Sequence, residues 1–199
     1  MKPRKKNIVK NKKSLFRESF SYLKESRKHI FLAAALFFIS AIFAFIFPGN
    51  FVFFDELLKN IVAKIKGKGF FELIWFIFQN NASSAFFAII LGIFLGVFPI
   101  INALTNGAVL GYVFALSSTE TGFRSLFYIL PHGIFELPAI FIALGVGMRL
   151  GFFIFAQPGK RASEFKIRFT KSIKTFFSIV LPLLIIAAII EGSFILFNG

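Results

Sequence analysis

The chain has 199 residues, of which 57% are hydrophobic, and its mean hydropathy is +0.79. This composition lies well above that of a soluble globular domain and predicts a membrane protein. The sequence contains no cysteine, which excludes disulfide bonds, thiolate catalysis and cysteine-based metal sites.

The positive charge is concentrated in two segments. The formal net charge is +14; 11 of the 23 Lys and Arg residues lie in the first 28 positions, and six more lie between Lys160 and Lys174. Basic segments beside membrane spans are attracted to anionic lipid and fix the orientation of the protein. No base-stacking platform accompanies the charge. We therefore expect the lipid bilayer, and not nucleic acid, as the partner of a basic cytoplasmic segment over residues 1–29.

The first predicted span follows this segment. Phe16, Phe20 and Leu23 are spaced for a short amphipathic helix on the membrane surface, and a disordered basic tail is the alternative. Residues 30–47 then form an apolar stretch of 18 residues, close to the minimum that crosses a bilayer. The remainder of the chain, residues 30–199, is predicted to be a single transmembrane domain.

Two interfacial helices are predicted next. Between residues 51 and 66, apolar side chains recur with a period of 3.6 and are separated by charged and amide residues. This amphipathic helix is too polar to span and should lie at the membrane surface. Residues 70–80 contain Glu72 and Trp75 and are predicted to approach the next span along the interface.

A long uncharged stretch predicts two spans. Residues 82–118 carry no charge over 37 positions, which is too long for one crossing and sufficient for two. Pro99 and the stretch from Asn102 to Gly107 are where we expect the chain to turn, giving spans over 82–98 and 103–118. The glycines of this hairpin permit close approach of helices, within the chain or between copies.

The fourth predicted span, residues 126–155, is longer than one straight crossing needs. Pro131 and Pro138 flank Gly133, and a proline disfavours helix both at its own position and just before it. We therefore expect a broken helix near residues 131–138.

The last span is predicted over residues 176–197. Five spans result, so the fold class is an all-α polytopic transmembrane bundle. If both basic segments are cytoplasmic, the N-terminus lies in the cytoplasm and the C-terminus outside, in a plasma membrane.

Two ionisable residues stand within the fourth span. His132 and Glu136 are four residues apart and share a face of a continuous helix. Ionisable groups in lipid cost about 2.5–3.5 kcal/mol each and usually face a bundle interior or a wet cavity. Four roles remain open: stabilising the helix break, relaying protons or ions together with Glu191, ligating a metal in a hydrolase, or offering a docking surface. One histidine within the membrane, with two carboxylates, is a weak basis for a metal site, so no metal site is predicted.

The sequence lacks the motifs of the common catalytic and nucleotide-binding sites. We find no nucleophile elbow, P-loop, dinucleotide-binding fingerprint or Cys/His metal cluster. We therefore expect no catalytic residue, no cofactor and no enzymatic activity.

One run of residues carries a family resemblance. The segment from Leu130 to Ala143, LPHGIFELPAIFIA, is followed by Gly145, Gly147 and Gly151 and strongly resembles the hallmark of the stage II sporulation protein M family. Further matching pieces are Asn80-Asn81, Asn106-Gly107 with Gly111, and the stretch from Ala187 to Gly192.

The resemblance implies a non-enzymatic membrane scaffold that gathers partner proteins. In endospore-forming bacteria this role would belong to engulfment, and relatives that never sporulate have no assigned process. The polar positions that match the family pattern are His132, Glu136, Asn81, Asn106 and Glu191. Since separate buried polar groups would each lack partners, we expect these five to converge inside the bundle. The rival interpretation is a small transporter or channel subunit using a His132/Glu136 cavity. Other membrane proteins or further copies of the chain are the expected partners.

Overall fold

The computed structural model describes residues 7–121 and 125–198, with the side chains of residues 15–118 and 133–195. All elements in these ranges are helical, and no strand occurs among them, so the all-α prediction is confirmed. In chain order they are α1 Asn7–Ile46, η1 Pro48–Phe51, α2 Phe54–Ile65, α3 Phe70–Leu91, α4 Val97–Thr121, α5 Ser125–Gly151, η3 Phe152–Phe155, α6 Arg161–Thr175, η4 Phe176–Val180 and α7 Leu181–Asn198.

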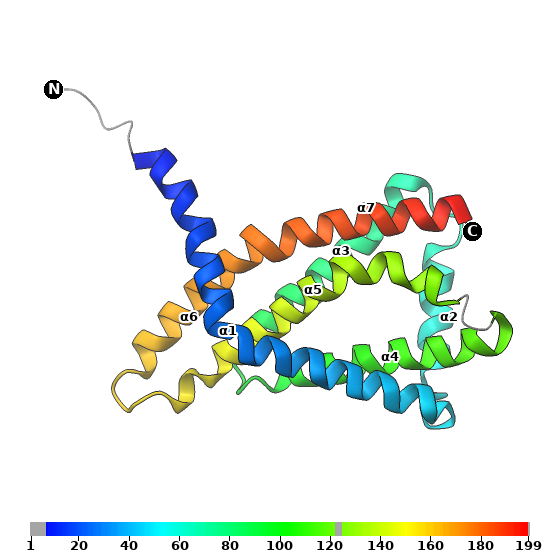
Figure 1. Cartoon of the computed structure of the whole chain (residues 1–199), viewed down its shortest axis with the longest axis horizontal. Coiled ribbons are helices and arrows are strands. Elements are labelled where there is room, and N and C mark those ends of the chain that lie inside the picture. The colour runs from blue at the N-terminus through cyan, green and yellow to red at the C-terminus, as the bar shows by residue number, and fades with distance from the viewer. Residues whose placement is uncertain (1–6, 122–124, 199) are drawn as a thin grey trace.

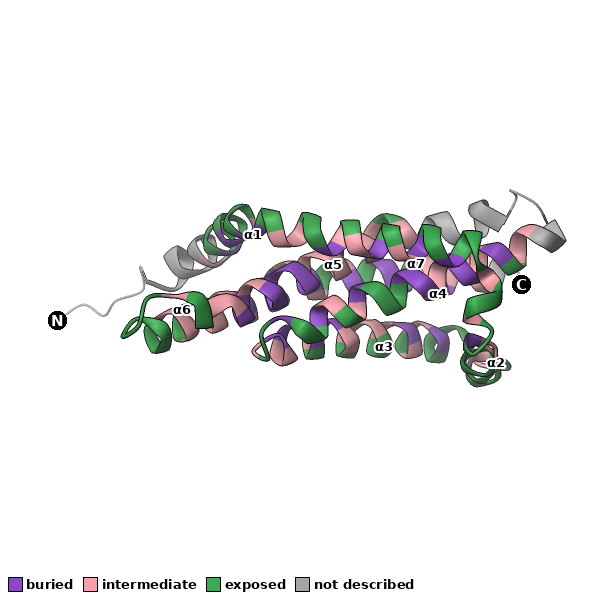
Figure 2. Cartoon of the chain, turned by 90° about the horizontal axis from the view of Figure 1, so that it is seen from below, coloured by how far each residue is buried: buried purple, intermediate pink, exposed green. Residues whose placement is uncertain are grey.

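Five helical stretches are long and apolar enough to cross a membrane, as the sequence predicts. Their outward faces carry large apolar side chains, among them Phe31 at 73% exposure, Phe71 at 81% and Phe155 at 75%. Figure 2 shows exposed residues along the outside of most helices and buried residues where the helices meet. An apolar exterior around a packed interior suits a protein whose solvent is lipid.

Helix α5 is the central helix of the bundle. It packs against α1, α3, α4 and α7, while α1 also lies along α4 and α3 along α7. Figure 1 shows α1 and α4 side by side, with α3, α5 and α7 together on the other side and α2 crossing one end. The fourth span therefore connects the two halves of the molecule.

Glycines allow backbones to touch at these contacts. A Cβ atom on Gly107 or Gly111 would overlap the carbonyl groups of Phe37 and Ala41 in α1. Gly147 meets Ala88 of α3 in the same way. Close approach of small residues is how helices gain packing energy in lipid, where no hydrophobic effect drives them together. These glycines are used within one chain, so an assembly of copies needs another surface.

The hairpin turns earlier than the sequence predicts. The chain reverses at residues 92–96, where Leu95 has φ 58° and Gly96 has φ 72°. Pro99 lies in the first turn of α4, where its missing N–H has no intrahelical partner to lose. The predicted interfacial stretch 70–80 belongs to α3 itself, and the predicted span bounds 82–98 and 103–118 are displaced accordingly.

The predicted break in the fourth span is wrong. Helix α5 runs without interruption through Pro131, Gly133 and Pro138. Each proline removes one backbone hydrogen bond, but transmembrane helices tolerate this because neighbouring groups satisfy the freed carbonyls. The irregular turn occurs instead in the last span, where the π-helix η4 directly precedes Pro182.

The two amphipathic predictions have different outcomes. Helix α2 confirms the helix predicted over residues 51–66, with its apolar Phe54 buried. Helix α1 is continuous from Asn7 into the first span, so the helical alternative for the N-terminal segment holds and the boundary at residue 30 falls inside a helix.

Candidate functional site

Asn81 and Glu136, two of the site residues predicted from the sequence, lie on the neighbouring helices α3 and α5. The two helices run parallel, since Gly147 meets Ala88 and Gly151 meets Gly92. Both helices carry a stripe with spacing 4, 3, 4 along this contact: Asn81, Ala85, Ala88 and Gly92 on α3, and Glu136, Ile140, Ala143 and Gly147 on α5. Continued along both helices, the glycine contacts put Asn81 at the level of the turn from Glu136 to Ile140. Glu136 is buried, with 9% exposure.

Asn106 belongs to a polar chain that joins α4 to α3. The Asn106 side chain donates from Nδ2 to the backbone oxygen and to Oδ1 of Asn102, both at 2.9 Å. Asn102 in turn donates to the Ser84 hydroxyl at 3.3 Å. On α3, Asn80 donates to Asn81 Oδ1 at 3.2 Å. Side-chain amides therefore tie the second and third spans together, close to the glycine hairpin.

Glu191 lies on the inner face of α7. It continues the buried stripe formed by Val180, Leu184 and Ala187, and it is itself half-buried. His132 is on α5, but its side chain lies outside the described residues. The structure thus links Asn106 through Asn102 to Ser84 and places Asn81 and Glu136 on neighbouring helices; convergence of all five residues stays a prediction.

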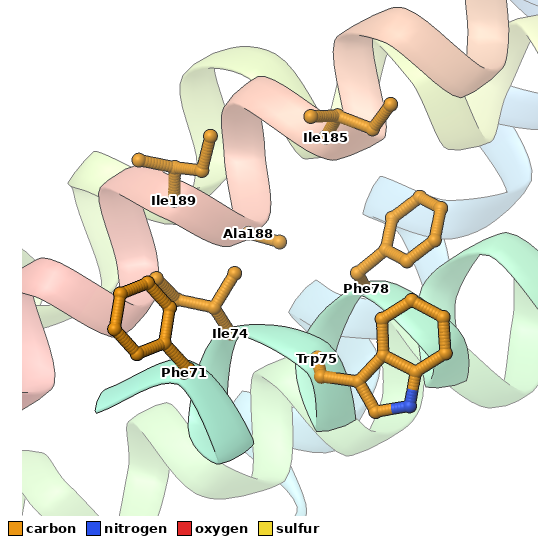
Figure 3. A pocket seen from close by; sticks show the side chains of 7 residues that line it. All are labelled: Phe71, Ile74, Trp75, Phe78, Ile185, Ala188 and Ile189. Atoms are coloured by element: carbon orange, nitrogen blue, oxygen red, sulfur yellow. The ribbon is translucent and has the colours of Figure 1, made fainter. Parts of the chain in front are cut away.

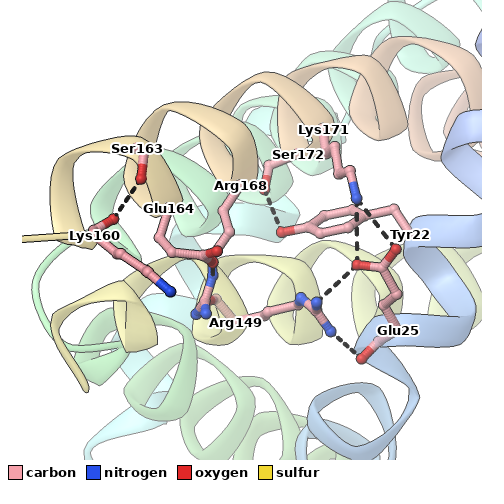
Figure 4. Close-up of polar contacts among 9 residues, drawn as sticks. All are labelled: Tyr22, Glu25, Arg149, Lys160, Ser163, Glu164, Arg168, Lys171 and Ser172. Atoms are coloured by element: carbon pink, nitrogen blue, oxygen red, sulfur yellow. Dashed lines mark hydrogen bonds and ion pairs between the residues drawn. The ribbon is translucent and has the colours of Figure 1, made fainter. Parts of the chain in front are cut away.

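A second polar cluster, which the sequence did not reveal, lies where α1, α5 and α6 meet (Figure 4). Glu25 accepts an ion pair from Arg149 at 2.8 Å and from Lys171 at 3.1 Å. The Arg149 guanidinium also donates to the Glu25 backbone oxygen. We call this set, together with Tyr22 and Ser172, the basic-end network.

Tyr22 is the buried centre of the basic-end network. Its ring lies 5.1 Å from the Arg149 guanidinium and 5.5 Å from Lys171 Nζ, distances typical of cation–π contacts. Its hydroxyl lies 3.3 Å from the Ser172 hydroxyl, with which it shares a hydrogen bond. One turn away, Glu18 pairs with Lys174 at 2.7 Å. These partners are 124 to 156 residues apart in the sequence, so no local pattern predicts their pairing. The sequence showed only that the two basic segments lack an equal number of acidic residues.

Two further features of the described residues concern metal binding and an apolar groove. Among them, no group of three His, Cys, Asp or Glu side chains lies close enough to hold a metal ion. An apolar groove of about 520 Å³ lies between α3 and α7 and is lined by aliphatic and aromatic side chains with Trp75 at its edge (Figure 3). Such a surface suits lipid chains and carries no reacting group.

The fold and these polar contacts define a multi-pass, all-helical membrane protein. The chain belongs to the stage II sporulation protein M family, whose sequence model matches residues 33–194. No curated protein and no solved structure gives a significant match to the chain.

Proposed function

We propose that the chain is a non-enzymatic membrane scaffold that holds partner membrane proteins. The observation that carries this proposal is the burial of Glu136 within the bundle, on the central helix α5. A carboxyl group that serves a transport pathway must meet water, whereas one that holds helices together is enclosed. Enclosure therefore favours a structural role for this residue.

Other polar side chains support the same interpretation, because each ties one helix to another. Tyr112 of α4 donates to Asp55 of α2 at 2.6 Å and so anchors the amphipathic helix to the bundle. Ser178 donates to Ser19 at 2.8 Å and joins the π-helical turn to α1. A body fixed in this way presents constant surfaces to a partner, which is what a scaffold requires.

For orientation, we propose that the basic-end network faces the cytoplasm of a plasma-membrane protein. The proposal is supported by the basic residues of α1 and α6 at this end, and an odd number of spans puts two termini on opposite sides of a membrane. Reporter fusions at Lys2 and Gly199 test this: the expected result is opposite sides, and reporters on the same side would contradict it.

The scaffold role is tested by affinity purification from cross-linked membranes. Wild type, Glu136→Gln and the exposed control Glu56→Gln are compared by quantitative mass spectrometry. We expect partner proteins in constant ratio to wild type and Glu56→Gln, and a lower ratio with Glu136→Gln. Recovery of the chain without any partner, from all three, would refute the scaffold role.

A second candidate is the small transporter or channel subunit. It is favoured by one observation, the position of the ionisable Glu136 within a candidate span. Purified protein in liposomes containing a pH-sensitive dye distinguishes the two. Proton flux that Glu136→Gln abolishes would support transport, and absence of flux in wild type supports the scaffold.

A further inference from the structure

Helix α3 presents an exposed polar stripe near its midpoint, on the side away from its contact with α5. Phe76, Asn80, Ser83 and Phe87 follow one another at spacings of 4, 3 and 4 residues, and we call this set the α3 seam. Asn80, Ser83 and Phe87 are exposed, and Phe87 is 57% exposed. The helix has 22 residues, so Asn80 lies at the level of the hydrocarbon core.

An exposed side-chain amide at this depth needs a polar partner. Burying an amide in hydrocarbon without a hydrogen bond costs several kcal/mol. Among the described residues, exposed Asn80 donates a hydrogen bond to Asn81, in which its Oδ1 acceptor and its second N–H take no part. The surface beside it is hollowed by about 400 Å³ between Phe76, Gln79, Asn80, Ser83 and Ser84.

The spacing and chemistry of the α3 seam identify the partner. Spacings of 4 and 3 form the contact line of paired helices, and an asparagine on that line sets register by bonding to the same asparagine of the second helix. An amide both donates and accepts, so two copies satisfy each other. No charged residue occurs in α3 beyond Glu72, so the seam offers nothing to a charged partner.

We propose that the α3 seam is the interface of a two-fold symmetric dimer of this chain. Two copies inserted in the same orientation pair their α3 helices in parallel about an axis along the membrane normal. Asn80 meets Asn80 of the second copy, and Ser83 allows the backbones to approach. The α3 seam is separate from the glycine contacts inside each copy. The inference does not depend on the scaffold role, because dimerisation and partner capture are measured separately.

The absence of cysteine makes the test direct. Ser83→Cys is introduced into two differently tagged copies that are co-expressed, and native membranes are oxidised. A disulfide forms when two Cα atoms lie within about 7 Å. The matched control is Ile186→Cys on α7, which is 43% exposed on another face. We expect a cross-linked product carrying both tags with Ser83→Cys and none with Ile186→Cys.

A second variant tests the amide itself. Asn80→Leu in the Ser83→Cys background should weaken association about 5- to 30-fold, the loss expected for one hydrogen bond between membrane helices. Thr105→Val, which alters an exposed polar residue of α4 off the seam, should leave association unchanged. Equal cross-linking at positions 83 and 186, or a product that carries one tag joined to another protein, would overturn the proposal.

Discussion

Replacing Gly147 by alanine should destabilise the bundle, whereas the same change at Gly133 should not. A Cβ at Gly147 would lie 2.5 Å from the Ala88 carbonyl oxygen and 3.0 Å from Pro99 Cγ. Ordinary van der Waals contact begins at 3.4 Å, so α3 would have to move about 0.9 Å away from α5 at this point. Among the residues whose side chains are described, a Cβ at Gly133 meets nothing closer than Leu137 of its own helix, at 3.5 Å.

The magnitude follows from two opposing effects. Both substitutions gain up to about 1 kcal/mol of helix propensity. Overpacking at Gly147 costs about 1–3 kcal/mol more, because the neighbouring atom is backbone and cannot rotate away. For a chain of this size each kcal/mol shifts the melting temperature by about 2–4 °C, so Gly147→Ala should melt about 2–12 °C below Gly133→Ala.

Thermal unfolding in a mild detergent, followed by circular dichroism, measures this difference. Both variants replace a glycine of α5 by alanine, so they differ only in the neighbours of the added methyl group. If Gly147→Ala is as stable as Gly133→Ala, the close contact of α5 with α3 at Gly147 is incorrect.

Two further substitutions test other contacts. Glu25→Gln removes the charged acceptor that Arg149 and Lys171 share, and because Glu25 is partly solvent-exposed it should lower the stability by about 1–2 kcal/mol. Glu18→Gln, at a more exposed ion pair, should cost less than about 1 kcal/mol. Equal losses of stability in detergent melts would show that Glu25 contributes no more than Glu18. Tyr112→Phe removes the hydrogen bond to Asp55 and should raise hydrogen exchange in α2 without changing that in α1; unchanged exchange in α2 would show that this bond does not hold the helix.

Sequence patterns predicted the elements whose signals are local. The helix over residues 51–66 followed from its apolar period, and the span count followed from the length of the uncharged stretches. The incorrect predictions are the chain reversal near Pro99 and the helix break near Pro131. Both rest on the tendency of proline to end a helix, without its position in the helix or the helices packed around it. In the structure Pro99 lies in a first turn and Pro131 in a tolerant membrane helix.

The polar sites were predicted less completely, because their partners are distant in sequence. Asn81 and Glu136 were identified as residues that need partners, but only the structure shows that their helices, α3 and α5, are parallel neighbours. The pairing of Glu25 with Arg149 spans 124 residues and left no local signal. Asn80 was noted as part of a family pattern, and only its outward direction revealed the α3 seam.

The central claim is that the polar groups inside the spans are enclosed and hold helices together. Labelling of Glu136→Cys by a membrane-impermeant maleimide tests it most directly, since the natural chain has no cysteine and Glu56→Cys on exposed α2 serves as a reactive control. The account predicts no labelling at position 136 in intact membranes from either side and full labelling after denaturation. Labelling at position 136 at a rate near that of position 56 would contradict it and favour a water-filled pathway.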